Sequence, residues 1–165
     1  MTTRMTPEEC AACMRALQPK IDNYAELLVR DGAAVQPGQE LVVQAPVEAR
    51  EFARRVVAAA YAAGAGHVTV IWADDEIIRM EYEALPVERF ETVPSWKVEQ
   101  LNSLAEAGAA FLFLEGSDPS ALKGVDPAKP ATASRARNSQ CKSFREGMDF
   151  GRNAWCIAGV PVLAW

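Results

Sequence analysis

Cys10 and Cys13 form a C-A-A-C motif, the one pair of thiols in this sequence spaced closely enough to act together. Such a pair can be a redox centre or half of a zinc site. A redox motif should open a helix after a strand, whereas this pair lies inside the first predicted helix. The other two cysteines, Cys141 and Cys156, are far away in the sequence. We interpret all four as structural thiols.

Polar residues follow two of the predicted strands. Asp74 and Asp75 come directly after the second strand, and Glu115, Ser117 and Asp118 follow the third. Ligands of open α/β sheets bind at the carboxyl ends of parallel strands, so both groups are candidate binding residues. The same residue types also cap helices and stabilise turns. We favour capping and turn formation for both groups.

The single histidine, His67, begins a strand after a glycine turn. A general base or a metal ligand needs partners at a defined geometry, so we interpret His67 as a surface or hinge residue. A glycine-rich phosphate-binding motif and a G-x-S-x-G nucleophile elbow are both absent. The residues themselves therefore predict no catalytic, cofactor-binding or metal-binding site in this chain.

The last third of the chain carries a basic run, which consists of Lys129, Arg135, Arg137, Lys142 and Arg145. The whole chain is acidic, with 17 Lys and Arg against 22 Asp and Glu and a formal net charge of −5. A mildly acidic protein has no overall electrostatic attraction for nucleic acid. We interpret the basic run as a solvated helix face and expect no nucleic-acid partner.

These residues must be positioned by an alternating series of strands and helices. Short apolar segments predict strands at 40–45, 67–73, 110–115 and 153–160. Helical patterns predict helices at 6–17, 21–30 after an interruption or kink at Pro19, 47–63, from 74 onward and 95–107 with Ser95 as cap. The stretch 127–144 is predicted to be largely helical. This order predicts an α/β fold: a mostly parallel sheet of about four strands covered by helices on both faces, with an N-terminal helical segment.

The chain of 165 residues and 17.9 kDa has room for one domain, which we expect to span 1–165. Its 50% apolar and 24% charged residues exclude a disordered chain, a collagen and a disulfide scaffold. The beginning of the sequence lacks the apolar run of a signal peptide, and no segment reaches the roughly 20 apolar residues of a membrane span. We therefore expect a cytoplasmic location and no membrane partner.

Several stretches together resemble one family. The longest is VQPGQELVVQAPVEAREFARRVVAAAYAAGAGHV at 35–68, and the others are YAELLV at 24–29, WADDE at 72–76, FLEGSDPSALKGVDP at 113–127 and AWCIAGVPVLAW at 154–165. The sequence from about Ile21 to Trp165 is similar to the N-terminal domain of the thermophilic-type metal-dependent aminopeptidases, the group of aminopeptidases T and S. The first twenty residues carry no part of this resemblance.

The resemblance implies a longer, homodimeric two-domain enzyme that releases N-terminal amino acids from peptide substrates. In that family, two divalent metal ions, zinc, cobalt or similar, are held by carboxylates, histidines and a tyrosine of a C-terminal domain. Those segments lie beyond Trp165, so none of the ligands is assigned here. The implied role of this chain is architectural, as a wall of the substrate chamber or a dimer contact. The alternative is a stand-alone α/β domain for binding or assembly without hydrolytic chemistry.

The end of the sequence, Pro161 to Trp165, is apolar. A terminal tryptophan is costly to leave in water as part of an apolar group. We expect a following domain to cover this segment, so that Leu163 and Trp165 are exposed in the isolated chain or buried against a neighbouring molecule. The alternative is that the segment folds back onto its own sheet.

Overall fold

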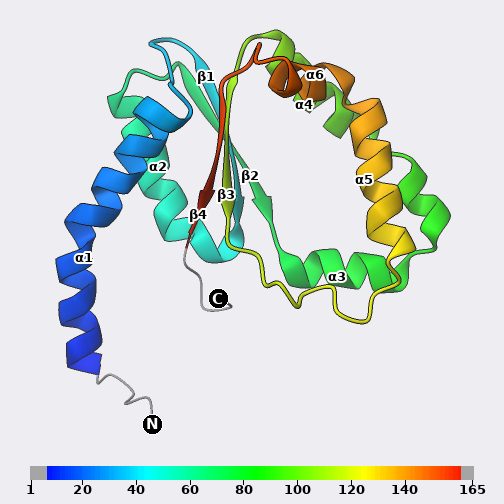
Figure 1. The fold of residues 1–165 in the computed structure, drawn as a ribbon, viewed down its shortest axis with the longest axis horizontal. Helices are drawn as coiled ribbons and strands as arrows, with labels where there is room; N and C mark the ends of the chain where they lie inside the picture. The colour runs from blue at the N-terminus through cyan, green and yellow to red at the C-terminus, as the bar shows by residue number, and fades with distance from the viewer. Residues whose placement is uncertain (1–6, 161–165) are drawn as a thin grey trace.

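A four-stranded parallel sheet forms the centre of the computed structural model, which describes residues 7–160, with side chains from residue 17 onward. The strands lie in the order β2-β1-β3-β4. Their bounds are Glu40–Pro46 for β1, His67–Ala73 for β2, Ala110–Glu115 for β3 and Trp155–Gly159 for β4. The predicted α/β fold with a parallel sheet is confirmed (Figure 1).

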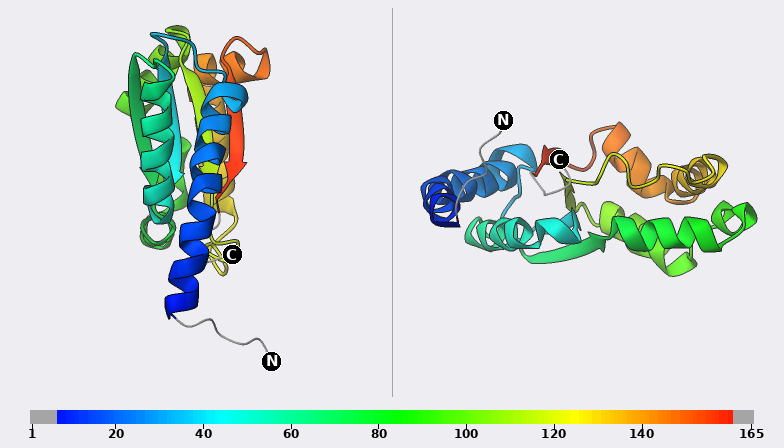
Figure 2. Two further views of the ribbon diagram at one scale, coloured as in Figure 1. Left: turned by 90° about the vertical axis from the view of Figure 1, so that its left-hand side faces the viewer. Right: turned by 90° about the horizontal axis from the view of Figure 1, so that it is seen from below.

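Helices lie on both sides of this sheet (Figures 1 and 2). On one side are α1 (Pro7–Leu27), the π-helical turn η1 (Leu28–Gly32), the 3-10 turn η2 (Val47–Ala49) and α2 (Arg50–Ala62). On the other side are α4 (Ser95–Glu106), α5 (Ala128–Gln140) and α6 (Lys142–Asp149). Helix α3 (Asp75–Ala84) extends away from the carboxyl end of β2, and the 3-10 helix η3 (Val87–Glu91) connects it to α4.

The predicted interruption between helices at 6–17 and 21–30 is wrong, because Pro19 lies inside the continuous helix α1. A proline in a helix interior costs about 3 kcal/mol. The turns that follow bury Ala25 and Leu28 in the core beside the sheet, and Asp22 pairs with Arg55 of α2. These contacts fix the helix on the C-terminal side of the proline.

The sheet face that contacts α1 and α2 has a close-packed core of small and branched side chains. Leu41 and Val43 of β1 are fully buried there, as are Val56 and Ala60 of α2. The alanines of α2 allow its backbone to approach the sheet closely.

The opposite face has a smaller, more aromatic core. Phe111 of β3 contacts Phe144 of α6 edge-on, with ring centroids 5.0 Å apart, and Cys141 is fully buried beside them. The predicted helical stretch over 127–144 is confirmed, but it is divided into two helices, because the chain leaves helical geometry at Cys141 (φ −87°, ψ 56°). This break lets α6 turn back onto α4 while α5 extends along the outer edge (Figure 1).

Two predicted boundaries also shift. Ser95 is the first residue of α4 and the preceding Pro94 occupies the cap position, so Ser95 is not the cap. The fourth strand begins at Trp155, two residues later than predicted. Asn153, which precedes the strand, is buried instead. Its side-chain amide donates to the carbonyls of Ala105 (3.0 Å) and Ala109 (2.8 Å).

Candidate functional site

Asp74, at the carboxyl end of β2, caps helix α3. Its Oδ1 accepts hydrogen bonds from the backbone N–H groups of Glu76 (3.0 Å) and Ile77 (3.1 Å). These bonds satisfy two of the free donors at the start of the helix. The predicted capping role is confirmed for Asp74.

Asp75 and Asp118 are brought together from the ends of β2 and β3. Asp75 Oδ2 accepts a hydrogen bond of 2.8 Å from the backbone N–H of Asp118. Asp118 Oδ1 in turn accepts from the backbone N–H and the hydroxyl of Ser120, both at 2.8 Å, and these bonds lower the pKa of the Asp118 carboxyl. Turn formation is therefore confirmed for Asp118, and its carboxylate is engaged in the loop that contains Ser117.

The other residues of that loop play no common role. Glu115 is exposed at the end of β3, and its backbone carbonyl accepts from Val160 N–H at 2.7 Å. Arg79 of α3 donates to the carbonyls of Ala121 (2.7 Å) and Lys123 (3.1 Å). Through these hydrogen bonds the loop after β3 positions α3 instead of forming a ligand site.

Among the described side chains, His67, Cys141 and Cys156 belong to no common cluster. His67 is exposed at the start of β2, opposite Glu40. Cys141 and Cys156 are both free, and burial raises the pKa of the Cys141 thiol. The Cys10–Cys13 motif lies in α1, and its side chains lie outside the described residues, as does the 161–165 segment.

The basic run does not form one solvated face. Arg135, Lys142 and Arg145 are exposed, but Lys129 and Arg137 are half-buried. The Lys129 ammonium donates to the carbonyl of Tyr82 at 2.6 Å, which ties α5 to α3. Arg137 reaches inward to Gln44 of β1 (3.5 Å) and over the ring of Phe144 (5.6 Å). For these two residues the prediction of a solvated face is wrong.

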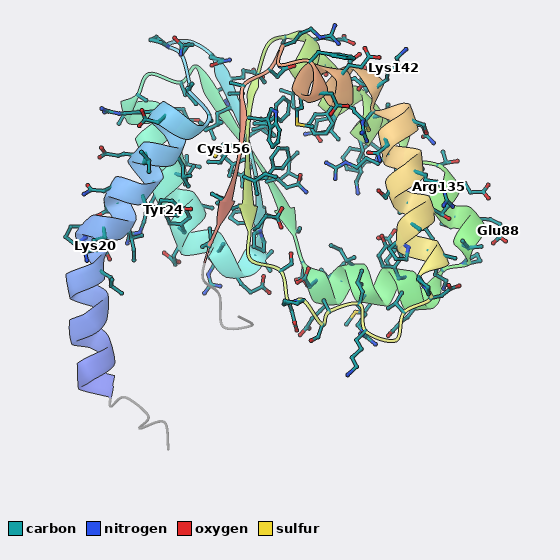
Figure 3. The ribbon with its side chains drawn as sticks, in the orientation of Figure 1. Lys20, Tyr24, Glu88, Arg135, Lys142 and Cys156 are labelled. Carbon is teal, nitrogen blue, oxygen red and sulfur yellow. The ribbon has the colours of Figure 1, made fainter. Side chains whose placement is uncertain are left out.

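A cavity of about 650 Å³ opens on the second face of the sheet, at the carboxyl end of β2. Segments from β2, α3, η3, α4 and α5 line it, and Figure 3 shows the frame that these elements make beside the sheet. Its walls are largely apolar, and its cations are Arg89, Lys97 and Arg137. This volume is in the range of small-molecule sites. The cavity is the candidate functional site of the described chain.

Sequence reasoning missed this cavity, although one signal points to it. Helix α3 is amphipathic, yet none of its residues is buried. Its Ile77 is 62% exposed, and Trp72 of β2 and Trp96 of α4 are also exposed beside the cavity. An apolar stripe without a covering element marks the wall of an opening instead of a core.

Comparison with known proteins gives this chain a family. The family model described as thermophilic metalloprotease (M29) matches residues 17–165. This protein belongs to the M29 family. It is 36% identical over 152 residues to aminopeptidase AmpS of Bacillus subtilis and 34% identical over 152 residues to aminopeptidase T of Thermus thermophilus. Each alignment covers 92% of this chain, but the chain spans only 37% of the length of either relative.

The fold of the M29 chain agrees with a solved relative. The structure of wild-type AmpT from Thermus thermophilus superposes with a TM-score of 0.82 at 33% identity, covering 90% of this chain and 38% of that one. The resemblance inferred from the sequence is thus confirmed. It extends to residue 17, slightly further toward the N-terminus than the quoted motifs.

The M29 name raises the question of whether these residues fit a metal centre. Among the residues that the structure describes, no group of three or more His, Cys, Asp or Glu is arranged to hold a metal ion. Asp75 and Asp118, which the strand ends bring together, are engaged by hydrogen bonds of the loop. The described residues therefore do not fit the family's metals. Within 7–160, no helix combines the length and apolar character of a membrane span.

Proposed function

We propose that this chain is the N-terminal domain of a two-domain, metal-dependent aminopeptidase that releases N-terminal amino acids from peptides. The observation that carries the proposal is the match to M29 over residues 17–165, which extends to the fold. The matched relatives are more than twice as long as this chain. Two divalent metals, zinc, cobalt or similar, would then be held by the rest of the enzyme, where an activated water attacks the peptide carbonyl.

The role proposed for this chain is architectural. The described residues offer apolar surface on the second face of the sheet, including Trp155 and Ile157 of the edge strand β4. Such surfaces suit a chamber wall or a dimer contact, because the free energy falls when another surface covers exposed apolar groups. The full enzyme would be a cytoplasmic homodimer, with no nucleic-acid or membrane partner.

An activity assay tests the division of labour. The purified chain is incubated with leucyl-p-nitroanilide and cobalt, zinc or manganese, and aminopeptidase T of Thermus thermophilus serves as positive control. We expect nitroaniline release from the control and none from this chain. Metal-dependent turnover that co-purifies with the chain would contradict the proposal.

The reading frame that follows Trp165 in the gene tests whether a second, metal-binding domain belongs to the same protein. We expect it to continue and to encode clusters of His and Glu suitable for two metals. A stop codon directly after Trp165 would favour the alternative, a domain that acts alone in binding or assembly.

A further inference from the structure

The cavity on the second face combines two kinds of wall. Ile71 and Ile77 provide apolar surface at the β2–α3 side, and Trp96 provides it from α4. Tyr82 and Phe90, whose rings lie 4.9 Å apart, complete the apolar wall between α3 and η3. These side chains can enclose an apolar group, and aromatic surfaces contribute strongly to such contacts.

Arg137 supplies charge at the inner end of the cavity. Its guanidinium is half-buried and forms no salt bridge with any carboxylate of the described residues. Its contacts are a long hydrogen bond to the Gln44 side chain and the face of the Phe144 ring. A guanidinium has five N–H donors, so most of its capacity is left for a ligand.

The other charges around the cavity favour an anion. Lys97 lies over the ring of Trp96 at 5.4 Å, and Arg89 has only a 3.5 Å contact to the carbonyl of Thr92. Two carboxylates also line the cavity, Asp74 and Glu81, but the first is committed to capping α3. The three cations outnumber the two carboxylates, so the lining carries a net charge of +1.

We propose that this cavity binds a carboxylate that carries an apolar or aromatic group, with the carboxylate on Arg137 and the apolar group against Ile77 and Trp96. Arginine is suited to this role because its planar fork pairs with both carboxylate oxygens. A cavity of about 650 Å³ accommodates a molecule of dipeptide size. The site does not depend on the proposed enzymatic function, because it uses residues of this chain alone.

The test compares a carboxylate with its neutral amide. The probes are N-acetyl-leucyl-phenylalanine and the same compound with a C-terminal amide, titrated into the 165-residue chain by calorimetry. N-acetylation blocks aminopeptidase cleavage, so the result is separate from the activity assay. N-acetylphenylalanine, a shorter acid, distinguishes a free amino-acid derivative from a peptide end. We expect the peptide acid to bind at least about tenfold more tightly than the amide, as one charge-assisted hydrogen-bond pair predicts.

Variants locate the binding site. Arg137→Gln should remove the difference between acid and amide, and Arg137→Lys should restore only part of it because an ammonium lacks the fork. Arg135→Gln is the matched control: it removes the same charge from the same helix at an exposed residue that does not line the cavity. Circular dichroism verifies that each variant is folded.

The proposal fails if acid and amide bind the wild-type chain equally, a comparison that requires no variant. It also fails if Arg135→Gln and Arg137→Gln weaken binding to the same extent, which would indicate a general charge effect. Absence of acid binding up to about 5 mM, weaker than any useful small-molecule site, would overturn it as well. A change in tryptophan fluorescence on addition of the acid, lost in Trp96→Phe, provides an independent readout.

Discussion

The two faces of the sheet are packed in opposite ways. On the first face, α2 and η1 bury Val29, Leu41 and Val56 completely, and the core there extends along the whole length of β1. On the second face, the buried cluster around Phe111 occupies the amino end of the strands, and the carboxyl end opens into the cavity beside Trp72.

This difference separates stability from binding. A close-packed face loses dispersion contacts with every atom removed, so its residues are constrained by packing. An open face made of exposed apolar groups contributes little to folding and is available for a ligand or a neighbouring surface. The packed face should therefore tolerate substitution poorly, and the open face should tolerate it well.

The largest expected contrast is between two leucines. Leu41→Ala on the first face should lower the free energy of unfolding by about 3 kcal/mol, because it leaves a void in a close-packed core. Leu101→Ala on the second face should cost about 1 kcal/mol, because this half-buried side chain already borders the cavity. Urea denaturation measures both. Equal losses would show that the second face is as closely packed as the first.

A smaller loss in the free energy of unfolding is expected at Asn153, whose hydrogen bonds join segments of the second face. Asn153→Ala should cost about 2 kcal/mol, since it removes two hydrogen bonds from a buried amide to the carbonyls of Ala105 and Ala109. Gly147→Ala should also destabilise, because its new Cβ would lie 2.0 Å from Asn153 Oδ1. Exposed Asn23→Ala is the control.

The double variant of Gly147 and Asn153 makes this prediction specific. Once Asn153 is alanine, the clash at residue 147 is gone. The stability losses of the two single variants should therefore sum to clearly more than the loss measured for the double variant. Thermal and urea unfolding of all four proteins give the coupling energy. Additive losses would mean that the Asn153 amide does not occupy the space next to Gly147.

How far the sequence predicts this molecule depends on whether a feature is local. The strand 67–73 and the cap Asp74 follow from local patterns, a short β-branched run and a carboxylate before a helix, and both are confirmed. The break at Pro19 was predicted from a local penalty that tertiary contacts outweigh. The division at Cys141 has no local signal, because it is set by the packing of α6 against α4.

The candidate site could not be predicted in the same way. Arg137 belongs to a basic run that suggests a solvated helix face, and only the direction of α5 in space turns it toward Gln44. Trp72 and Trp96 come from different elements, 24 positions apart. A cavity depends on how elements are arranged around it, whereas composition and spacing describe single elements. The apolar stripe of the unburied helix α3 was the available clue.

A third effect, of about 1 kcal/mol, should come from the cap that positions this helix. Asp74→Ala removes both bonds to the first turn of α3, and such losses are typically of this size. Asp74→Asn is the matched control, because asparagine caps almost as well. Amide exchange should increase across 75–84 in the alanine variant alone. An equally large loss in both variants would point to the negative charge as the stabilising feature.

The smallest effect should come from the exposed apolar face of α3. Ile77→Ser removes most of an apolar side chain that is 62% exposed, yet the free energy of unfolding should change by only about 0.5 kcal/mol or less. Val56→Thr on the first face changes a single group, but it places a hydroxyl in a fully buried site and should cost more. Urea denaturation compares the two. A loss above about 1 kcal/mol for Ile77→Ser would show that α3 folds onto the second face in solution and closes the cavity, since burial is what makes an isoleucine costly to remove.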